Sequence, residues 1–191
     1  LLPAGAELVV FDGLRDIPPF DEEDREARSA PEPVEAFRAA LRDADGVLLG
    51  AVHQPVGGET WVGGRGLPTS LDGKPVAPLE DRSLAECSLA TYIHPATLGD
   101  PDVLQSWLAL VAGVATPRVF GSGSMDLCGV ATGRVGVWAQ HSTPAWDWLP
   151  GQALVEAAGG RTAVVEHRGH RWHLAGNPQA LGELVERLQA S

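Results

Sequence analysis

Apolar and polar positions in the first 52 residues predict a strand, a helix and a second strand. The run at 7–11 (ELVVF) is β-branched and ends at an Asp-Gly pair, which indicates a strand entering a turn. From Pro33 to residue 44, apolar residues recur at spacings of three and four, which predicts an amphipathic helix. The continuous apolar run at 47–52 is typical of a strand covered on both faces. We therefore expect a parallel β-loop-α-β unit in which 47–52 is an inner strand.

The remainder of the chain continues to alternate between strand and helix patterns. The elements predicted there are a glycine-rich hairpin at 57–75, strands at 88–93, 118–120, 135–139, 161–166 and 171–174, and helices at 125–131, 145–158 and 178–189. A further helix is predicted to begin at Pro101, with Val103, Leu104, Trp107, Leu108 and Val111 on its apolar side. Pro150 fits a first helical turn only if its helix begins near Trp148 or Leu149. The pattern predicts an α/β fold, with helices layered on both faces of a mixed, partly parallel sheet.

Composition and charge narrow the classes of partner. The 191 residues carry a net charge of -11, which argues against binding to nucleic acid or to an anionic membrane surface. The most apolar stretch, 107–115, is too short to cross a bilayer, and no secretory leader pattern opens the chain, so a cytoplasmic location is expected. Two cysteines without close spacing indicate neither a disulfide framework nor a zinc site.

A set of motifs beyond residue 47 carries a family resemblance. The most specific is 145–151 (AWDWLPG) followed by 156–160 (EAAGG), and the others are 50–55 (GAVHQP), 71–75 (LDGKP), 121–127 (GSGSMDL) and 175–178 (AGNP). In this order they resemble the inositol monophosphatase family over residues 47–191. The resemblance implies Mg²⁺-dependent hydrolysis of a phosphomonoester, with a small phosphorylated molecule as substrate. A homodimer is one assembly that the sequence leaves open.

The same resemblance assigns a candidate site. It implies that Asp147 is a metal ligand and substrate contact, and that Gly121, Ser122 and Gly123 form a backbone surface for the substrate's alcohol portion. Gln140 stands where inositol-hydrolysing members carry a glutamate, so a neutral amide replaces a carboxylate there.

Simpler interpretations of these residues stay open. Asp147 could cap a helix, and the glycine turn could be an ordinary helix start. The tryptophans Trp138, Trp146 and Trp148 are predicted to be core residues.

Most of the metal ligands that the family uses have no counterpart in this sequence. The acidic pair of an early helix and the D-P-x-D-G-T segment are both absent, and Asp12-Gly13 does not match that segment. Because Mg²⁺ requires several oxygen ligands at one point, we expect weak or no magnesium binding and little or no hydrolysis. No catalytic residue is assigned. The alternative function is a catalytically silent α/β protein.

Residues 1–50 carry a different resemblance. The segments 14–21 (LRDIPPFD), 34–41 (VEAFRAAL) and 44–49 (ADGVLL) are similar to the early part of NADPH-dependent FMN reductases, which are flavodoxin-like. This predicts a chimera or fragment, with a flavodoxin-like segment at 1–46 joined to 47–191 in one continuous domain. The loop that would contact the flavin is replaced by 53–55 (HQP), and the family's phosphate-binding loop would precede Leu1, so no FMN binding is expected.

Overall fold

The computed structural model describes residues 32, 34, 35 and 49–191. Residues 32, 34 and 35 are helical, in agreement with part of the helix predicted at 33–44. The predicted strand at 7–11, and its pairing with the strand at 47–52, lie outside the described residues. The chain divides into two units, Leu1–Gly46 and Val47–Ser191, and the second contains the two sheets and their helices.

A five-stranded mixed sheet forms the centre of the second unit. Its strands are β5 (Ser88–Thr91), β6 (Thr116–Arg118), β7 (Val137–His141), β8 (Arg161–His167) and β9 (His170–Gly176), in the order β6-β5-β7-β9-β8. Strand β5 runs parallel to both β6 and β7, whereas β9 runs antiparallel to β7 and β8. This confirms the predicted α/β fold with a partly parallel sheet.

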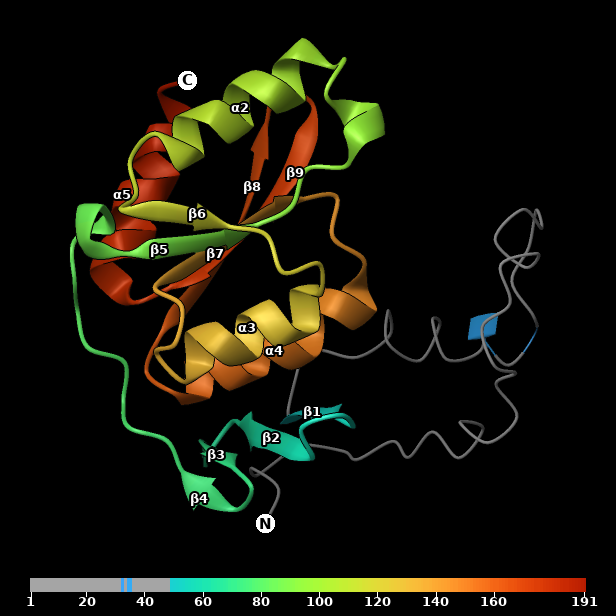
Figure 1. The fold of residues 1–191 in the computed structure, drawn as a ribbon, viewed down its shortest axis with the longest axis vertical. Helices are drawn as coiled ribbons and strands as arrows, with labels where there is room; N and C mark the ends of the chain where they lie inside the picture. The colour runs from blue at the N-terminus through green and yellow to red at the C-terminus, as the bar shows by residue number, and fades with distance from the viewer. Residues whose placement is uncertain (1–31, 33, 36–48) are drawn as a thin grey trace, which may run out of the picture. The chain divides into compact units, whose positions relative to one another are not determined.

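Helices cover both faces of this sheet, as Figure 1 shows. Helices α2 (Pro101–Val111) and α5 (Pro178–Gln189) pack on one face, and α3 (Gly123–Ala131) and α4 (Ala145–Ala157) pack on the other. Alternation along β7 divides its side chains between two buried clusters, because Val137 and Ala139 pack with α2 and α5 while Trp138 packs with α3 and α4. Sheet and helices are therefore held together by a core on each face.

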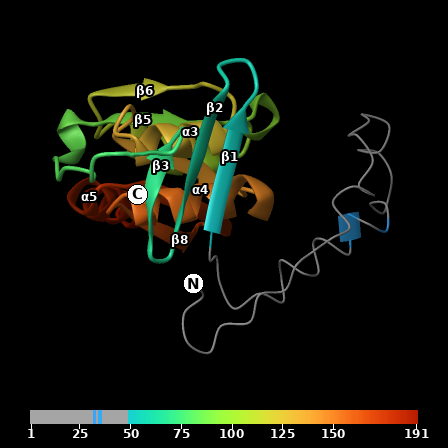
Figure 2. The same cartoon turned by 90° about the horizontal axis from the view of Figure 1, so that it is seen from below.

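A second, antiparallel sheet lies across α3 and α4 (Figure 2). It consists of β1 (Leu49–Gln54), β2 (Glu59–Gly64), β3 (Leu67–Leu71) and β4 (Lys74–Pro75), in chain order. The glycine-rich hairpin predicted at 57–75 is thus confirmed. The Thr69 hydroxyl donates to the Leu154 carbonyl at 2.6 Å and ties this sheet to α4. The second sheet adds a fourth layer to the predicted three.

The strand predicted at 47–52 is observed from Leu49, and the expectation that both of its faces are covered is wrong for the described residues. Its predicted inner place beside 7–11 lies outside the described residues. In the described part of the chain, β1 is an edge strand that pairs antiparallel with β2, and Leu49 is 53% exposed. Only the side of β1 that carries Gly50 and Val52 turns inward, where a Cβ on Gly50 would lie 2.2 Å from the Pro150 carbonyl oxygen. An apolar run is compatible with one covered face as well as two, and the composition of 47–52 could not distinguish them.

The helix predicted at 145–158 is confirmed as α4, and it begins before the Trp148 or Leu149 start that would put Pro150 in a first turn. Its first residue is Ala145, with Pro144 as N-cap, so Pro150 lies inside the helix. A proline there cannot donate to the carbonyl of Trp146, and its ring crowds that carbonyl. Trp146 is 51% exposed, so its predicted core position is also wrong.

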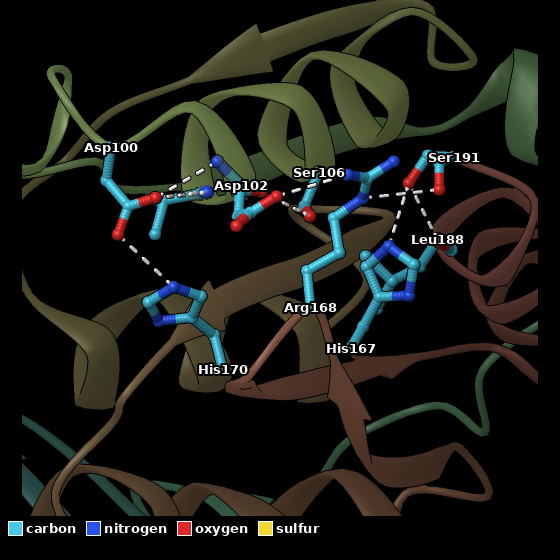
Figure 3. A network of polar contacts seen from close by, with 9 residues as sticks. Asp100, Asp102, Ser106, His167, Arg168, His170, Leu188 and Ser191 are labelled. Carbon is cyan, nitrogen blue, oxygen red and sulfur yellow. Dashed lines mark hydrogen bonds and ion pairs between the residues drawn. The ribbon is translucent and has the colours of Figure 1, made fainter.

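Polar contacts tie the β8–β9 turn to the start of α2 and to the end of the chain (Figure 3). Arg168 pairs with Asp102 at 3.1 Å, and His170 pairs with Asp100, the N-cap of α2, at 3.3 Å. His167 contacts the Ser191 hydroxyl at 3.1 Å.

No helix of the described residues is long and apolar enough to span a membrane.

Candidate functional site

The predicted site residues lie at one edge of the central sheet. Because β5, β6 and β7 are parallel, their carboxyl ends share an edge, which is where open α/β sheets place ligands. The glycine turn follows β6, and α4 follows β7. Gly121, Ser122, Gly123, Gln140 and Asp147 thus come together at the carboxyl edge of the parallel strands.

The glycine turn begins α3 and contacts Asp147. Gly121 has φ of +88°, a conformation that favours glycine. Ser122 is the N-cap, and its hydroxyl accepts from the Met125 N–H at 3.4 Å. The Ser124 hydroxyl donates to Asp147 Oδ1 at 3.4 Å. The turn is therefore both an ordinary capped helix start and a neighbour of the candidate metal position.

Gly123 lies near the side chains of Asp147 and Trp138. A Cβ built there would be 3.7 Å from Asp147 Cβ and 3.7 Å from Trp138 Cζ2. These are ordinary van der Waals distances, so the turn passes close to both side chains.

Asp147 does not cap α4. Pro144 is the N-cap and no side chain caps the helix, whereas Asp147 is the third residue of its first turn and is half-buried. Its charge still lies near the positive end of the helix dipole. The carboxylate is therefore available for Ser124 and for a ligand.

Gln140 faces the same layer as Trp138, two residues before it along β7. It is half-buried, and its direct partner across the sheet is His173 of β9. Cross-strand partners place their side chains side by side on one face. An amide in this position offers both donors and an acceptor where the family's inositol-hydrolysing members offer a carboxylate.

Sequence reasoning missed His173. Its side chain is 6% exposed, its ring lies 5.0 Å from that of Trp148, and its Nδ1 has no hydrogen-bond partner among the described residues. Burial lowers the pKa of His173 to about 4, so the ring is neutral at pH 7. The signal was the alternation of β9, which places His173 on the face opposite Trp172 and Leu174.

Asp126, in the first turn of α3, was also missed as an individual residue. It is 3% exposed, and burial raises its pKa to about 6. The available signal was a carboxylate within an otherwise apolar segment of a helix. Aspartate is rarely buried unless it has a partner, so such a position is unusual.

The described residues do not fit a resident magnesium ion. They contain no group of three or more histidine, cysteine, aspartate or glutamate side chains that could hold a metal. Asp147 has a hydroxyl, not a second carboxylate, as its neighbour. Since Mg²⁺ needs several oxygen ligands in octahedral geometry, Asp147 alone cannot supply its site.

The fold and site define a layered α/β protein with a glycine turn and an acidic helix start at one sheet edge. A model of the inositol monophosphatase family matches residues 36–188, and the chain belongs to that family. The match crosses the seam predicted near 46–50, and the comparisons give no support to a separate FMN reductase segment.

Individual relatives agree with this assignment. The chain is 27% identical to inositol-1-monophosphatase of Caulobacter vibrioides, covering 80% of this chain and 62% of that protein. It is 27% identical to Nus factor SuhB of Pasteurella multocida, covering 78% and 58%. It superposes on the inositol monophosphatase structure from Anabaena with a TM-score of 0.66 at 25% identity, covering 75% and 61%. The chain thus spans about three fifths of the length of these relatives.

Proposed function

We propose that this chain carries the substrate-holding part of a phosphomonoesterase site and by itself hydrolyses phosphate esters weakly or not at all. The observation that carries the proposal is the packing of the glycine turn against Asp147, with Ser124 bonded to its carboxylate. The ligand would be a small phosphorylated molecule. The family membership supports the class of ligand, and the lack of a carboxylate cluster in the described part supports the low turnover.

Each residue would have a distinct task. The backbone at Gly121, Ser122 and Gly123 would contact the alcohol portion of the substrate, because the turn presents its main chain to the site. The Gln140 amide would hydrogen-bond a substrate hydroxyl as donor or acceptor. Asp147 would accept a hydrogen bond from the substrate or contribute one ligand to a divalent ion, and no residue here is assigned to proton transfer or nucleophilic attack.

A catalytically silent binding or interaction protein is the second candidate. The single site carboxylate beside a serine favours it, because phosphoryl transfer needs a positioned nucleophile and charge compensation. Turnover separates the two functions: metal-dependent phosphate release above background supports an enzyme, and ligand binding without release supports the silent protein.

We expect Mg²⁺ to bind Asp147 no more tightly than about 1 mM, or about -4 kcal/mol, because one carboxylate leaves water in the other ligand positions. The measurement is calorimetric titration with Mg²⁺ and Mn²⁺ on the parent and on Asp147→Asn, with phosphate release from inositol 1-phosphate and an aryl phosphate. Asp147→Asn should abolish the residual binding. Asp102→Asn, at a similar first-turn position in α2, is the matched control and should leave it unchanged.

Micromolar metal affinity lost in Asp147→Asn would contradict this expectation. It would show that carboxylates outside the described residues, Asp12 first among them, complete the site.

We expect no FMN binding. The flavin-contacting loop of the FMN reductases is replaced by 53–55, which belong in part to β1 of the antiparallel sheet. The purified chain should therefore show no absorption near 450 nm and no quenching of added FMN fluorescence. A yellow protein with near-stoichiometric flavin would revive the flavodoxin-like interpretation of residues 1–46.

The organisation of residues 1–46 and 47–191 as one continuous domain remains a prediction. So do a cytoplasmic location, a homodimer, and the absence of nucleic-acid and membrane partners.

A further inference from the structure

The turn between β7 and α4 carries a serine in a strained backbone conformation. Ser142 is exposed and has a φ of +52°, in the left-handed region that residues with a side chain rarely adopt. Its N–H donates to the Arg171 carbonyl of β9 at 2.8 Å, so the neighbouring strand holds this conformation. Residues in such conformations cluster at functional sites, and a serine on a sharp strand-to-helix turn presents its hydroxyl for reaction.

A histidine ring lies against this hydroxyl. His141 Nδ1 is 3.2 Å from Ser142 Oγ, and this hydroxyl has no other hydrogen-bond partner in the described part of the chain. In the tautomer with its proton on Nε2, Nδ1 accepts a hydrogen bond from the hydroxyl. Burial lowers the pKa of His141, and His170 acts in the same direction while Asp100 opposes it. The neutral ring that prevails at pH 7 is the form that serves as a general base for a nucleophile.

Packing restricts the orientation of the His141 ring. Its centroid lies 5.4 Å from that of Trp172, which is fully buried, and 5.8 Å from that of His170, which meets it edge-on at 79°. His170 Nε2 in turn lies 3.3 Å from Asp100 Oδ2, the ion pair drawn in Figure 3. Contacts with two rings, one of them bound to a carboxylate, therefore help to keep Nδ1 beside the serine.

The start of α4 supplies hydrogen-bond donors next to the serine. The helix begins at Ala145, three residues after Ser142, and no side chain caps it. N–H groups at a helix start stabilise negative charge, including the oxyanion that forms when a hydroxyl adds to a carbonyl group. One turn of the chain thus carries a nucleophile, a base and donors for an oxyanion.

A second histidine–serine contact, at the end of the chain, differs in one respect. His167 Nε2 is 3.1 Å from Ser191 Oγ, but the Ser191 hydroxyl donates to the Leu188 carbonyl at 2.8 Å (Figure 3). The hydroxyl proton is therefore directed to a carbonyl and not to the imidazole. This pair has the same residue types at nearly the same distance, which makes it the matched control.

We propose that Ser142 and His141 form a nucleophile and general-base pair that hydrolyses uncharged carboxylic esters. Ser142 Oγ adds to the carbonyl carbon while its proton passes to His141 Nδ1. The bond to the alcohol oxygen then breaks, and the alcohol leaves with that proton, which gives an acyl-serine. Water adds to the acyl carbon as His141 takes its proton, and the carboxylic acid leaves as Ser142 recovers a proton from His141. The net charge of -11 disfavours anionic esters.

The first experiment measures hydrolysis of para-nitrophenyl acetate at pH 7 by the full chain, with EDTA present to separate it from metal-dependent phosphate release. Ser142→Ala and His141→Gln should each lower the rate at least about tenfold. Alanine also carries a Cβ, so Ser142→Ala keeps the backbone strain of the parent, and circular dichroism verifies the fold. Ser191→Ala and His167→Gln should stay within about twofold of the parent.

The second measurement identifies the acylated residue. After brief exposure to para-nitrophenyl acetate and quenching in acid, mass spectrometry of the parent should locate the acetyl group on Ser142. His141→Gln should carry at least about tenfold less of this label. Phosphate release from inositol 1-phosphate is followed in the same variants and should not change, so the ester reaction and the proposed function succeed or fail separately.

Ester hydrolysis retained in Ser142→Ala would overturn the proposal, because another group would then be the nucleophile. An acetyl group on His141 or on any residue other than Ser142 would overturn it too, as would an equal loss of activity in Ser191→Ala. If Ser142→Ala does not fold, Ser142→Gly takes its place: glycine tolerates the positive φ, and this variant must also lack the activity.

Discussion

Replacement of Gly151 by alanine is expected to lower the free energy of unfolding by about 3 kcal/mol, the upper end of the usual cost of overpacking a core. A Cβ at Gly151 would lie 2.4 Å from both Cβ and Cδ1 of Leu127, which is fully buried. Helices α3 and α4 would have to separate, and they carry the glycine turn and Asp147. We therefore expect loss of ligand binding together with the loss of stability, measured by urea unfolding followed by circular dichroism.

Gly182 provides the matched control. It also lies within a helix, α5, but a Cβ there would meet nothing within 4 Å. Gly182→Ala should stabilise the protein by up to about 1 kcal/mol through helix propensity. If both glycine substitutions changed stability equally, close packing of α3 on α4 would not be the reason for Gly151.

Relative to the parent, the free energy of unfolding of Asp126→Asn is expected to rise by about 3 kcal/mol from a pH below both pKa values of Asp126 to a pH above both. Each unit between the unfolded and folded pKa values corresponds to about 1.4 kcal/mol. Burial raises the pKa of Asp126 from 3.8 in the unfolded chain to about 6 in the folded protein. At a pH below both values the carboxyl group is protonated in both states and costs nothing. As pH rises through the unfolded and then the folded pKa, ionisation penalises the folded state. Asparagine carries no such penalty.

The measurement is urea unfolding of the parent and Asp126→Asn at pH 4 and pH 8. Relative to the parent, the variant should be more stable at pH 8 than at pH 4 by about 2.4 kcal/mol, because pH 4 lies just above the unfolded pKa and a small part of the penalty is already present there. Asp102→Asn, at an exposed position, should show no comparable change between the two pH values. A difference independent of pH would mean that Asp126 is not a buried carboxylate that titrates near pH 6.

Predictions of secondary structure were accurate where local sequence signals define an element, and less accurate where they depended on which apolar residues are buried. The start of the helix at Pro101 was predicted correctly, because a proline at the first helical position and an apolar stripe are local signals. The predicted strand at 118–120 corresponds to β6 at Thr116–Arg118, and Val119 and Phe120 beyond it are each 61% exposed. Hydrophobicity alone cannot show which side chains will be covered.

Sequence analysis predicted the residues of the candidate site, but not the buried polar residues near it. Motif spacing placed Gly121–Gly123, Gln140 and Asp147 together, and the structure brings them to one sheet edge. Asp126 and His173 are isolated polar residues in apolar segments, and nothing in their sequence neighbours shows that they would be buried or that Trp148 would lie against His173.

The sequence by itself determined the α/β class, because that class depends on the periodicity of apolar residues, and it contained the motifs whose resemblance indicated the family. Only the tertiary structure decided that β1 is an edge strand of a second sheet within the described residues, that Asp147 leaves α4 uncapped, and that Asp126 is buried. The physical reason is that burial, hydrogen-bond partners and the resulting pKa depend on residues far apart in the chain, which local patterns do not specify.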